Sequence, residues 1–288
     1  MDRISSGVLS LDLDLGGGLP FNKIIEICGP PNSSKTSFVL NLIKQNPDCV
    51  CAYLDIDNNI NYNYLETLGI DMDSLIISKP ESAEQVIQIV ETLISNKAVD
   101  IIVIDSIATL ISQDELNSSM SKAIKTNTIT ETIKKLSSLT YKSDCVMVLI
   151  NQIRNDLKSK KYGSEIAIAD RALNSYASIR LDIRQTNELH HYDQIIGVKL
   201  KVSIKKNKTA LKKGDGIAIK HYFDSGIDTI DDLLELAINA HILEKKGSWY
   251  NFGGQKIQGK QEFIQFLKEN NGYLLDYVYE RVLKHYFN

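Results

Sequence analysis

Short apolar runs alternate with amphipathic stretches along the first half of the chain. The apolar runs occupy residues 23–29, 50–55, 75–78, 101–105 and 146–151 and are rich in isoleucine, valine and leucine. Stretches with helical spacing of apolar residues lie between them, at residues 37–45, 64–68 and 83–95 and in a longer segment that ends at Tyr141. Runs that are apolar throughout and separated by helices are typical of a parallel sheet that helices cover on both faces.

The pattern changes after Tyr176, where apolar and polar residues begin to alternate. Residues 178–184, 198–206 and 217–223 predict antiparallel strands that extend the same sheet. From residue 228 a small mixed segment follows, with an expected helix at 228–240, a glycine-rich hairpin at 249–259 and two short helices. We therefore predict an α/β core over residues 1–227 and a small α+β carboxy-terminal domain over residues 228–288, with Trp249 and Tyr250 in the core of that domain.

Composition and charge limit the protein to a few classes. With 288 residues, 43% of them hydrophobic, the chain is long enough for one large α/β core and a small appendage. A formal net charge of -3 means that a nucleic-acid partner would be bound by local basic patches. No apolar stretch approaches the roughly 20 residues that span a bilayer, so we expect a cytoplasmic protein without a membrane partner. The four cysteines lack CxxC spacing, and we expect neither a zinc site nor disulfides.

The candidate chemistry is concentrated in GPPNSSKT, residues 29–36, between an expected strand and an expected helix. A P-loop needs a glycine where the backbone wraps phosphates, a lysine that reaches their oxygens and a hydroxyl that binds Mg²⁺. Gly29, Lys35 and Thr36 meet these needs, whereas Ser34 stands at the place of the second glycine. The segment predicts a nucleotide-phosphate site formed by eight residues: Gly29, Pro30, Asn32, Ser33, Ser34, Lys35, Thr36 and Ser37.

A carboxylate suited to Mg²⁺ ends the expected strand 101–105. Asp105 follows the apolar run IIVI, as does the acidic residue that supports Mg²⁺ in P-loop proteins. Without the preceding P-loop, an ordinary strand-ending aspartate would be the better interpretation. With it, Thr36 and Asp105 are the expected metal-binding pair.

Several segments resemble the bacterial RecA recombinases in order and spacing. They are ISSGVLSLDLDLGGGLP, IIEICGPPNSSKT, CAYLDID, IIVIDSIATL, INQIR, YASIRLDIR and KKNK, and GSWYNFGGQKIQGK resembles the carboxy-terminal domain of that family. The resemblance covers nearly the whole chain. It implies a RecA-type P-loop ATPase core with a mostly parallel central sheet, and a DNA-dependent ATPase that uses ATP and Mg²⁺ for single-stranded DNA binding, homologous pairing and strand exchange.

The resemblance also assigns roles outside the P-loop. Tyr64 would stack on adenine, and Gln152 would sense the γ-phosphate and signal to a DNA-binding loop. Lys206 and Lys208 would reach the ATP of a neighbouring subunit, which implies a homo-oligomer. Asp57 stands where the family has the glutamate that activates the attacking water, and its side chain is one methylene shorter. The catalytic candidates are therefore Lys35, Asp57 and Gln152, and we expect slow hydrolysis.

Basic residues around two expected loops are the candidate DNA contacts. The loops follow Leu110 and lie between Ile153 and Leu173. Cations there can neutralise DNA phosphates, although a run of charges is as often only a solvated face. The candidates are Lys158, Lys160, Lys161 and Arg171 in the second loop and Lys134 on the helix after the first.

Two functions of different class remain open. The first is a DNA-dependent ATPase and recombinase, favoured by Gln152, Lys206 and Lys208. The second is a paralogue that binds ATP, hydrolyses little and regulates a partner recombinase, favoured by Ser34 and Asp57. The sequence also begins close to the expected ATPase core, without the amino-terminal arm by which the family's subunits clasp one another, so we do not expect assembly by that route.

Overall fold

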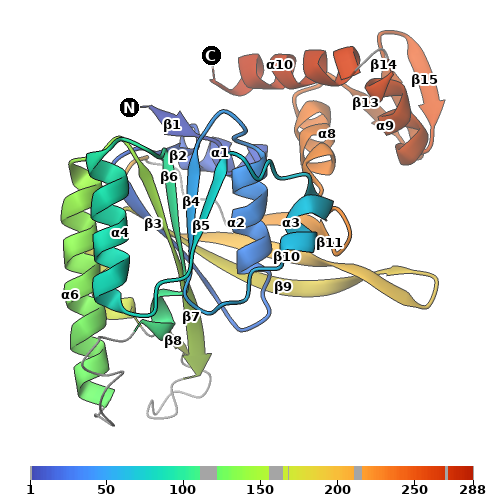
Figure 1. Ribbon diagram of the computed structural model, residues 1–288. Helices are drawn as coiled ribbons and strands as arrows, with labels where there is room; N and C mark the ends of the chain where they lie inside the picture. The colour runs from blue at the N-terminus through green and yellow to red at the C-terminus, as the bar shows by residue number, and fades with distance from the viewer. Residues whose placement is uncertain are drawn as a thin grey trace.

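One large sheet organises the protein, for which we describe a computed structural model over residues 2–110, 122–155, 165–167, 169–210, 216–269 and 272–287. Ten strands in these ranges form this sheet, in the order β12-β11-β10-β9-β3-β7-β6-β4-β5, with β8 paired to β7 (Figure 1). The strands are β3 (Lys23–Gly29), β4 (Cys51–Asp55), β5 (Leu75–Ser78), β6 (Ile101–Asp105), β7 (Val146–Asn155), β8 (Glu165–Ala167), β9 (Ile179–His191), β10 (Gln194–Asn207), β11 (Ile217–Tyr222) and β12 (Gly226–Ile227). The predicted α/β fold with a mostly parallel central sheet is confirmed.

Helices cover both faces of the sheet because its strands are apolar on both faces. In β6, Ile101 and Val103 join one buried cluster, and Ile102 and Ile104 join the other. This is the alternation that a pleated strand imposes. One face packs against α1 (Leu9–Leu15), α2 (Lys35–Lys44) and α3 (Tyr62–Leu68), and the other against α4 (Ala83–Ser95), α6 (Lys122–Tyr141) and α7 (Asp170–Tyr176) (Figure 1).

Several elements differ from the predicted ranges, three of them in ways that bear on the site. The helix α2 begins at Lys35 rather than at residue 37, and β7 continues to Asn155 rather than ending at 151. The expected strand 178–184 becomes the longer β9, which pairs in parallel with β3 and antiparallel with β10. The prediction of an antiparallel strand holds for the pairing with β10 and is wrong for the pairing with β3, because alternation indicates the exposure of a strand's faces and not the direction of its neighbours. Strands β9 and β10 form a hairpin that extends beyond the sheet (Figure 1).

The first residues form short elements against the core. They are β1 (Arg3–Ile4), which pairs with β2 (Leu19–Pro20), and the helix α1 between them. A 3-10 turn, η1 (Ile107–Thr109), follows β6.

The residues after 228 pack around a hydrophobic cluster of their own. The elements are α8 (Thr229–Asn239), the strands β13 (Glu244–Lys246), β14 (Trp249–Phe252) and β15 (Gln255–Gln258), and the helices α9 (Lys260–Lys268) and α10 (Tyr273–Phe287). Tyr250 is buried and stacks on Phe263, with ring centroids 5.0 Å apart, as predicted. Trp249 is 48% exposed, so its prediction as a core residue was wrong. Neighbouring residues of a strand point to opposite faces, and Tyr250 takes the buried one.

Polar contacts join this segment to the large sheet. Asp231 on α8 forms an ion pair with Lys220 on β11, at 2.5 Å, and another, within the same segment, with Lys260 on α9. The Asp232 carboxylate accepts a hydrogen bond from the Ser10 amide at 2.9 Å. None of the helices in the described ranges is long and apolar enough to cross a membrane.

Candidate active site

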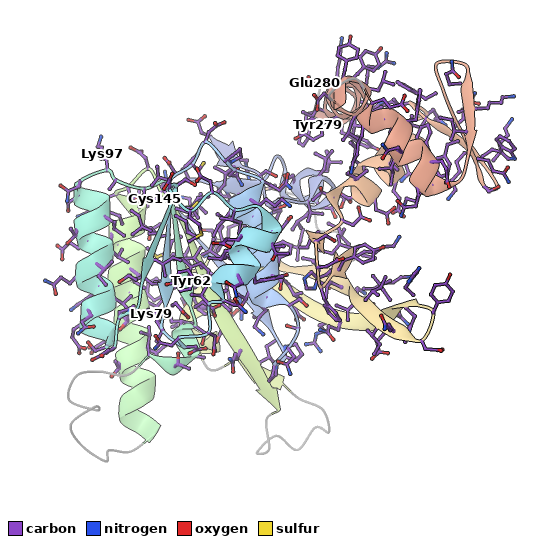
Figure 2. The ribbon with its side chains drawn as sticks, turned by 45° about the vertical axis from the view of Figure 1, so that its right-hand side comes forward. Tyr62, Lys79, Lys97, Cys145, Tyr279 and Glu280 are labelled. Atoms are coloured by element: carbon purple, nitrogen blue, oxygen red, sulfur yellow. The ribbon has the colours of Figure 1, made fainter. Side chains whose placement is uncertain are left out.

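A cleft of about 420 Å³ lies at the carboxyl ends of the parallel strands. Lys79, just after β5, and Cys145, just before β7, mark the two ends of the sheet in Figure 2, and the cleft is at the end of Lys79. Ligands of open parallel sheets bind at this edge. Eight of the predicted site residues line it: Asn32, Ser33, Ser34, Lys35, Thr36, Asp57, Asp105 and Gln152.

The backbone of residues 29–36 makes the close turns that a P-loop requires. A Cβ on Gly29 would collide with the carbonyl oxygen of Ile183, so only glycine fits there. Asn32 and Ser34 have φ angles of 58° and 62°, in the left-handed region that side chains disfavour. Ser34 is also the N-cap residue of α2, and its side chain makes no capping hydrogen bond.

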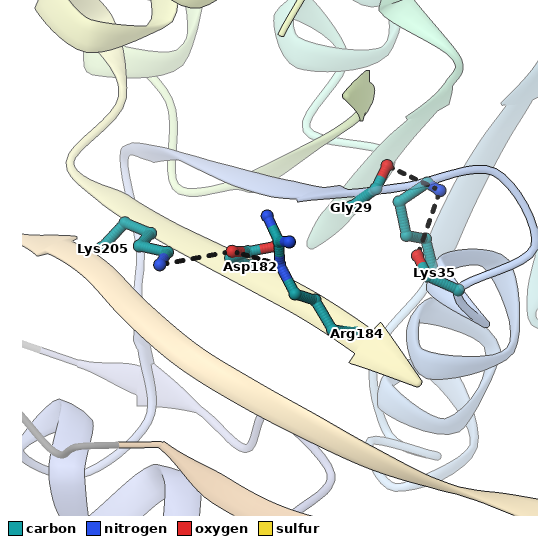
Figure 3. A network of polar contacts seen from close by, with 6 residues as sticks. Gly29, Lys35, Asp182, Arg184 and Lys205 are labelled. Carbon is teal, nitrogen blue, oxygen red and sulfur yellow. Dashed lines mark hydrogen bonds and ion pairs between the residues drawn. The ribbon is translucent and has the colours of Figure 1, made fainter. Parts of the chain in front are cut away.

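Lys35 is folded back onto the loop that precedes it. Its Nζ donates to the carbonyl oxygens of Pro30 and Gly29, at 2.7 and 3.2 Å. Figure 3 shows the contact with Gly29. Burial lowers the pKa of Lys35, and the nearby Asp105 carboxylate opposes that shift. The first turn of α2 contains no acidic residue, so the positive end of the helix dipole faces the cleft uncompensated. An anion such as a phosphate would be stabilised there.

Asp105 is held at the end of β6 by two hydroxyl groups. Its Oδ2 accepts hydrogen bonds from Tyr53 Oη at 2.6 Å and from Thr36 Oγ1 at 2.8 Å. Burial raises the pKa of Asp105, the two hydrogen bonds lower it, and the carboxylates of Asp57 and Asp55 raise it further. Sequence reasoning missed Tyr53, for which the only signal is a polar-tipped residue inside an apolar strand.

These groups fit a magnesium ion that also binds phosphate oxygens. Thr36 and Asp105 offer hard oxygen ligands, and a divalent cation would offset the clustered carboxylates that raise the pKa of Asp105. Within the described part of the chain, no group of three or more His, Cys, Asp or Glu residues could hold a metal by itself. Mg²⁺ commonly takes one or two protein ligands and completes its shell with water and phosphate.

Two catalytic candidates face the cleft from β4 and β7, which lie on either side of β6 in the sheet. Asp57 follows β4, is half-buried, and its carboxylate makes no hydrogen bond or ion pair with a described residue. Gln152 lies on β7, opposite Gly29 in the β3–β7 ladder. Beyond Gln152, β7 pairs with β8 at Ile153 and Ala167, so this strand leads directly into the expected second loop.

The remaining predicted residues lie outside the cleft lining. Gly29 and Pro30 contribute only carbonyls to Lys35, and Ser37 is half-buried within α2. Tyr64 is half-buried on α3, with its hydroxyl 3.3 Å from His221 Nε2.

Lys206 on β10 and Lys208, just after it, direct their amino groups to the end of α7 and do not line the cleft. Lys206 Nζ donates to Asn174 O at 2.5 Å, and Lys208 Nζ donates to Ser175 O at 3.3 Å. Burial, with help from the neighbouring Lys208 charge, lowers the pKa of Lys206 to about 8. Within one subunit these lysines therefore contact helix carbonyls rather than the P-loop.

Five cleft residues were absent from the sequence-based set: Pro31 and Ile150, which lie within predicted elements, and Asn59, Gln185 and Phe223. Asn59 follows Asp57, Gln185 lies on β9 and donates to the Asn32 carbonyl, and Phe223 follows β11 with 49% of its surface exposed. No local pattern distinguishes them, since Gln185 and Phe223 reach the cleft only through the order of strands in the sheet.

Two buried carboxylates, Glu26 and Asp182, form ion pairs on the strands next to the cleft. Glu26 on β3 is fully buried, pairs with Arg180 on β9, and accepts a hydrogen bond from Asn151 Nδ2 on β7 at 2.8 Å. Asp182 lies beside Cys28 in the β3–β9 ladder and accepts from Arg184 at 3.0 Å and Lys205 at 3.3 Å (Figure 3). The Glu26–Arg180 pair is buried, and burying such a pair is costly unless it is fully satisfied, so this pair fixes the relative positions of β3 and β9 more than it adds stability.

The candidate DNA contacts are mostly outside the described residues. Lys158, Lys160 and Lys161 lie outside them, and Arg171 belongs to α7 but its side chain is not described. Lys134 is exposed on α6.

Comparison with known proteins agrees with the geometry. Residues 1–228 match the RecA N-terminal domain, and residues 231–286 match the RecA C-terminal domain. The chain is 35% identical over 277 residues to Protein RecA of Acinetobacter baylyi, covering 94% of this chain and 79% of that protein. It is also 35% identical to Protein RecA of Geobacter metallireducens, covering 94% and 81%, and 36% identical to that of Delftia acidovorans, covering 93% and 75%.

Proposed function

The chain belongs to the RecA family, and from that premise we propose that it is an ATP-dependent recombinase. It would bind single-stranded DNA, pair it with a homologous duplex and exchange strands between the two. The observation that carries the proposal is the convergence of Lys35, Thr36 and Asp105 in one cleft, with Gln152 facing them on the strand that enters the second loop. An ATP site and a DNA loop are thereby joined by a single strand.

The cleft residues divide the binding of ATP between them. Lys35 would exchange the loop carbonyls for the β- and γ-phosphate oxygens, beside the amino-terminal amides of α2. Thr36 and Asp105 would hold Mg²⁺, which when bound neutralises charge on the phosphates during transfer. Phe223 and Tyr64 would contact the base, and Gln152 would respond to the γ-phosphate.

Asp57 would orient the attacking water. Its carboxylate faces the cleft without a competing partner among the described residues. Its short side chain places the oxygens further from an attacking water than a glutamate would, and small misplacements reduce rates strongly. We therefore propose DNA-dependent ATP hydrolysis with slow turnover.

The experiment that tests the proposal is ATP turnover with and without single-stranded DNA over a range of protein concentrations. Lys206 and Lys208 would act on the ATP of a neighbouring subunit, so turnover per subunit should rise with concentration. A mixture of Lys206→Ala and Lys35→Ala should partly recover turnover, because each subunit supplies what its neighbour lacks. Turnover that is independent of DNA and of protein concentration, with no recovery in the mixture, would contradict the proposed recombinase function.

The second candidate function is a regulator that binds ATP and hydrolyses little. Two observations favour it: the strained Ser34 in the phosphate loop and the short Asp57. In that case ATP would still bind, and the concentration series would be flat.

DNA binding would be electrostatic and centred on the second loop. Replacing Lys158, Lys160 and Lys161 by alanine should weaken binding to all sequences alike and flatten the dependence of affinity on salt. The matched control replaces three exposed lysines at the opposite end of the sheet: Lys44, Lys97 and Lys142. Equal salt slopes for the two triple variants would remove the DNA site from this loop.

We also propose that residues 1–227 and 228–288 are two structural units of a cytoplasmic homo-oligomer. The separate cluster around Tyr250 and Phe263 supports the division. Limited proteolysis should cut first near residue 228, and cleavage elsewhere would argue against that boundary.

A further inference from the structure

A buried histidine contacts both Phe223, which lines the nucleotide cleft, and Tyr64, the residue proposed to contact the base. His221 is on β11 and is only 4% exposed. Its Nε2 is 3.3 Å from the hydroxyl of Tyr64 on α3. Its ring meets Phe223 edge to face, with centroids 6.0 Å apart. One imidazole therefore touches both Tyr64 and Phe223.

The two aromatic residues come from segments that are otherwise distant in sequence. Phe223 follows β11 and lines the cleft together with Lys35. Tyr64 belongs to α3, which begins just after the loop that brings Asp57 and Asn59 to the same cleft. Where β12 passes α3 the approach is close, since a Cβ on Gly226 would lie 2.8 Å from Leu68 Cδ2. His221 supplies the polar contact across this junction.

The environment of His221 favours a neutral ring with a defined proton. Burial lowers the pKa of His221, so the imidazole is uncharged near neutral pH. Its Nδ1 is buried and has no hydrogen-bond partner among the described residues. A buried N–H group without a hydrogen-bond partner is rarer and costs more free energy than an unprotonated ring nitrogen without one. We therefore assign the proton to Nε2, from which it is donated to Tyr64 Oη.

We propose that His221 is a positioning residue for the nucleotide base. It holds the Tyr64 phenol next to β11 through a hydrogen bond and packs against the Phe223 ring edge to face. The inference rests on the proposed ATP site and adds to it the residue that sets its base-binding wall. His221 does not itself line the cleft, so it acts through the two rings it contacts. Phosphate binding, which belongs to Lys35 and the start of α2, should not depend on it.

The test separates base recognition from phosphate recognition by calorimetry with two probes, Mg-ATP and Mg-tripolyphosphate. His221→Leu introduces an apolar side chain of similar size and removes the hydrogen bond to Tyr64. We expect ATP to bind about 5-fold more weakly, which corresponds to about 1 kcal/mol, with the affinity for tripolyphosphate unchanged. His221→Gln, which retains an N–H donor, should recover most of the loss.

Variants of Tyr64 test the same contact from the other side. Tyr64→Phe should reproduce the loss in ATP affinity, and the double variant with His221→Leu should lose no more than either single variant. Tyr62→Phe is the matched control, because Tyr62 is an exposed phenol on the same helix (Figure 2). If His221→Leu fails to fold, Tyr64→Phe still decides the question.

The outcomes distinguish this inference from the function on which it rests. Parent-like ATP affinity in His221→Leu or in Tyr64→Phe would overturn the positioning role and leave the phosphate site intact. An equal loss for ATP and tripolyphosphate would also overturn it, since that result indicates general distortion. A parent protein that binds neither probe would contradict the ATP site itself.

Discussion

Replacing Ser34 by glycine should stabilise the protein, because Ser34 is held in a left-handed conformation. Its φ and ψ angles are 62° and 28° at the N-cap of α2. That conformation costs an L-residue about 1 to 2 kcal/mol, and glycine avoids this cost. Glycine loses about 0.5 to 1 kcal/mol more conformational entropy on folding, so the net gain should be about 0.5 to 1 kcal/mol. No capping bond is lost, since the Ser34 side chain makes none.

The measurement is the free energy of unfolding in a denaturant titration, checked by the thermal midpoint, which should rise by about 1 to 3 °C. Ser34→Ala is the matched control, because it removes the hydroxyl but keeps the Cβ that causes the strain. We expect that variant to stay within about 0.5 kcal/mol of the parent. A Ser34→Gly variant less stable than the parent, or a Ser34→Ala variant as stable as Ser34→Gly, would refute the strain argument.

Three further predictions concern charged residues. Lys35→Ala should abolish Mg-ATP binding with an unchanged circular dichroism spectrum; unchanged affinity would contradict the P-loop assignment. Asp57→Glu should raise ATP turnover and Asp57→Asn should remove it, and turnover at the parent rate in Asp57→Asn would exclude Asp57 as the residue that orients the water. Burial raises the pKa of Asp12 from 3.8 to about 6, so the native state binds this proton more tightly than the unfolded state and the stability contributed by Asp12 falls as pH rises from about 4 to about 6. Relative to Asp12→Asn, the parent should therefore lose up to about 3 kcal/mol of unfolding free energy over this range, and parallel pH curves would contradict the shift.

The strands that pack on both faces were predictable from the sequence because burial leaves a continuous apolar run. Strands β3, β5 and β6 and the helix α4 have the predicted bounds. The start of α2 was missed because Lys35 and Thr36 turn their side chains to the cleft, and the apolar pattern begins only at Phe38. The outer part of β9 was missed because its exposed residues carry no apolar signal, and pairing with β10 alone makes it a strand.

The P-loop was predictable because it is contiguous, and the rest of the cleft was not. Residues 29–36 carry their chemistry in a single segment between a strand and a helix. Tyr53, Gln185 and Phe223 lie on or beside β4, β9 and β11, none of which neighbours another of the three in the sheet. Which of them meet is decided by long-range packing, and no spacing in the sequence encodes it.

The charges in the cleft favour a nucleotide that binds together with a cation. Asp57 and Asp105 face the cleft with Lys35 as the opposing charge, and burial raises the pKa of Asp105 while it lowers that of Lys35. A triphosphate alone would bring more negative charge next to these two carboxylates, whereas a divalent cation between them would be attracted to both. A bound cation would be held by Asp105 with Thr36 and would offset the repulsion from Asp57, and Lys35 could then exchange its loop carbonyls for the phosphate oxygens. Lys206 and Lys208, whose amino groups contact carbonyls at the end of α7, would on our proposal add positive charge where a second subunit presents its own cleft to them.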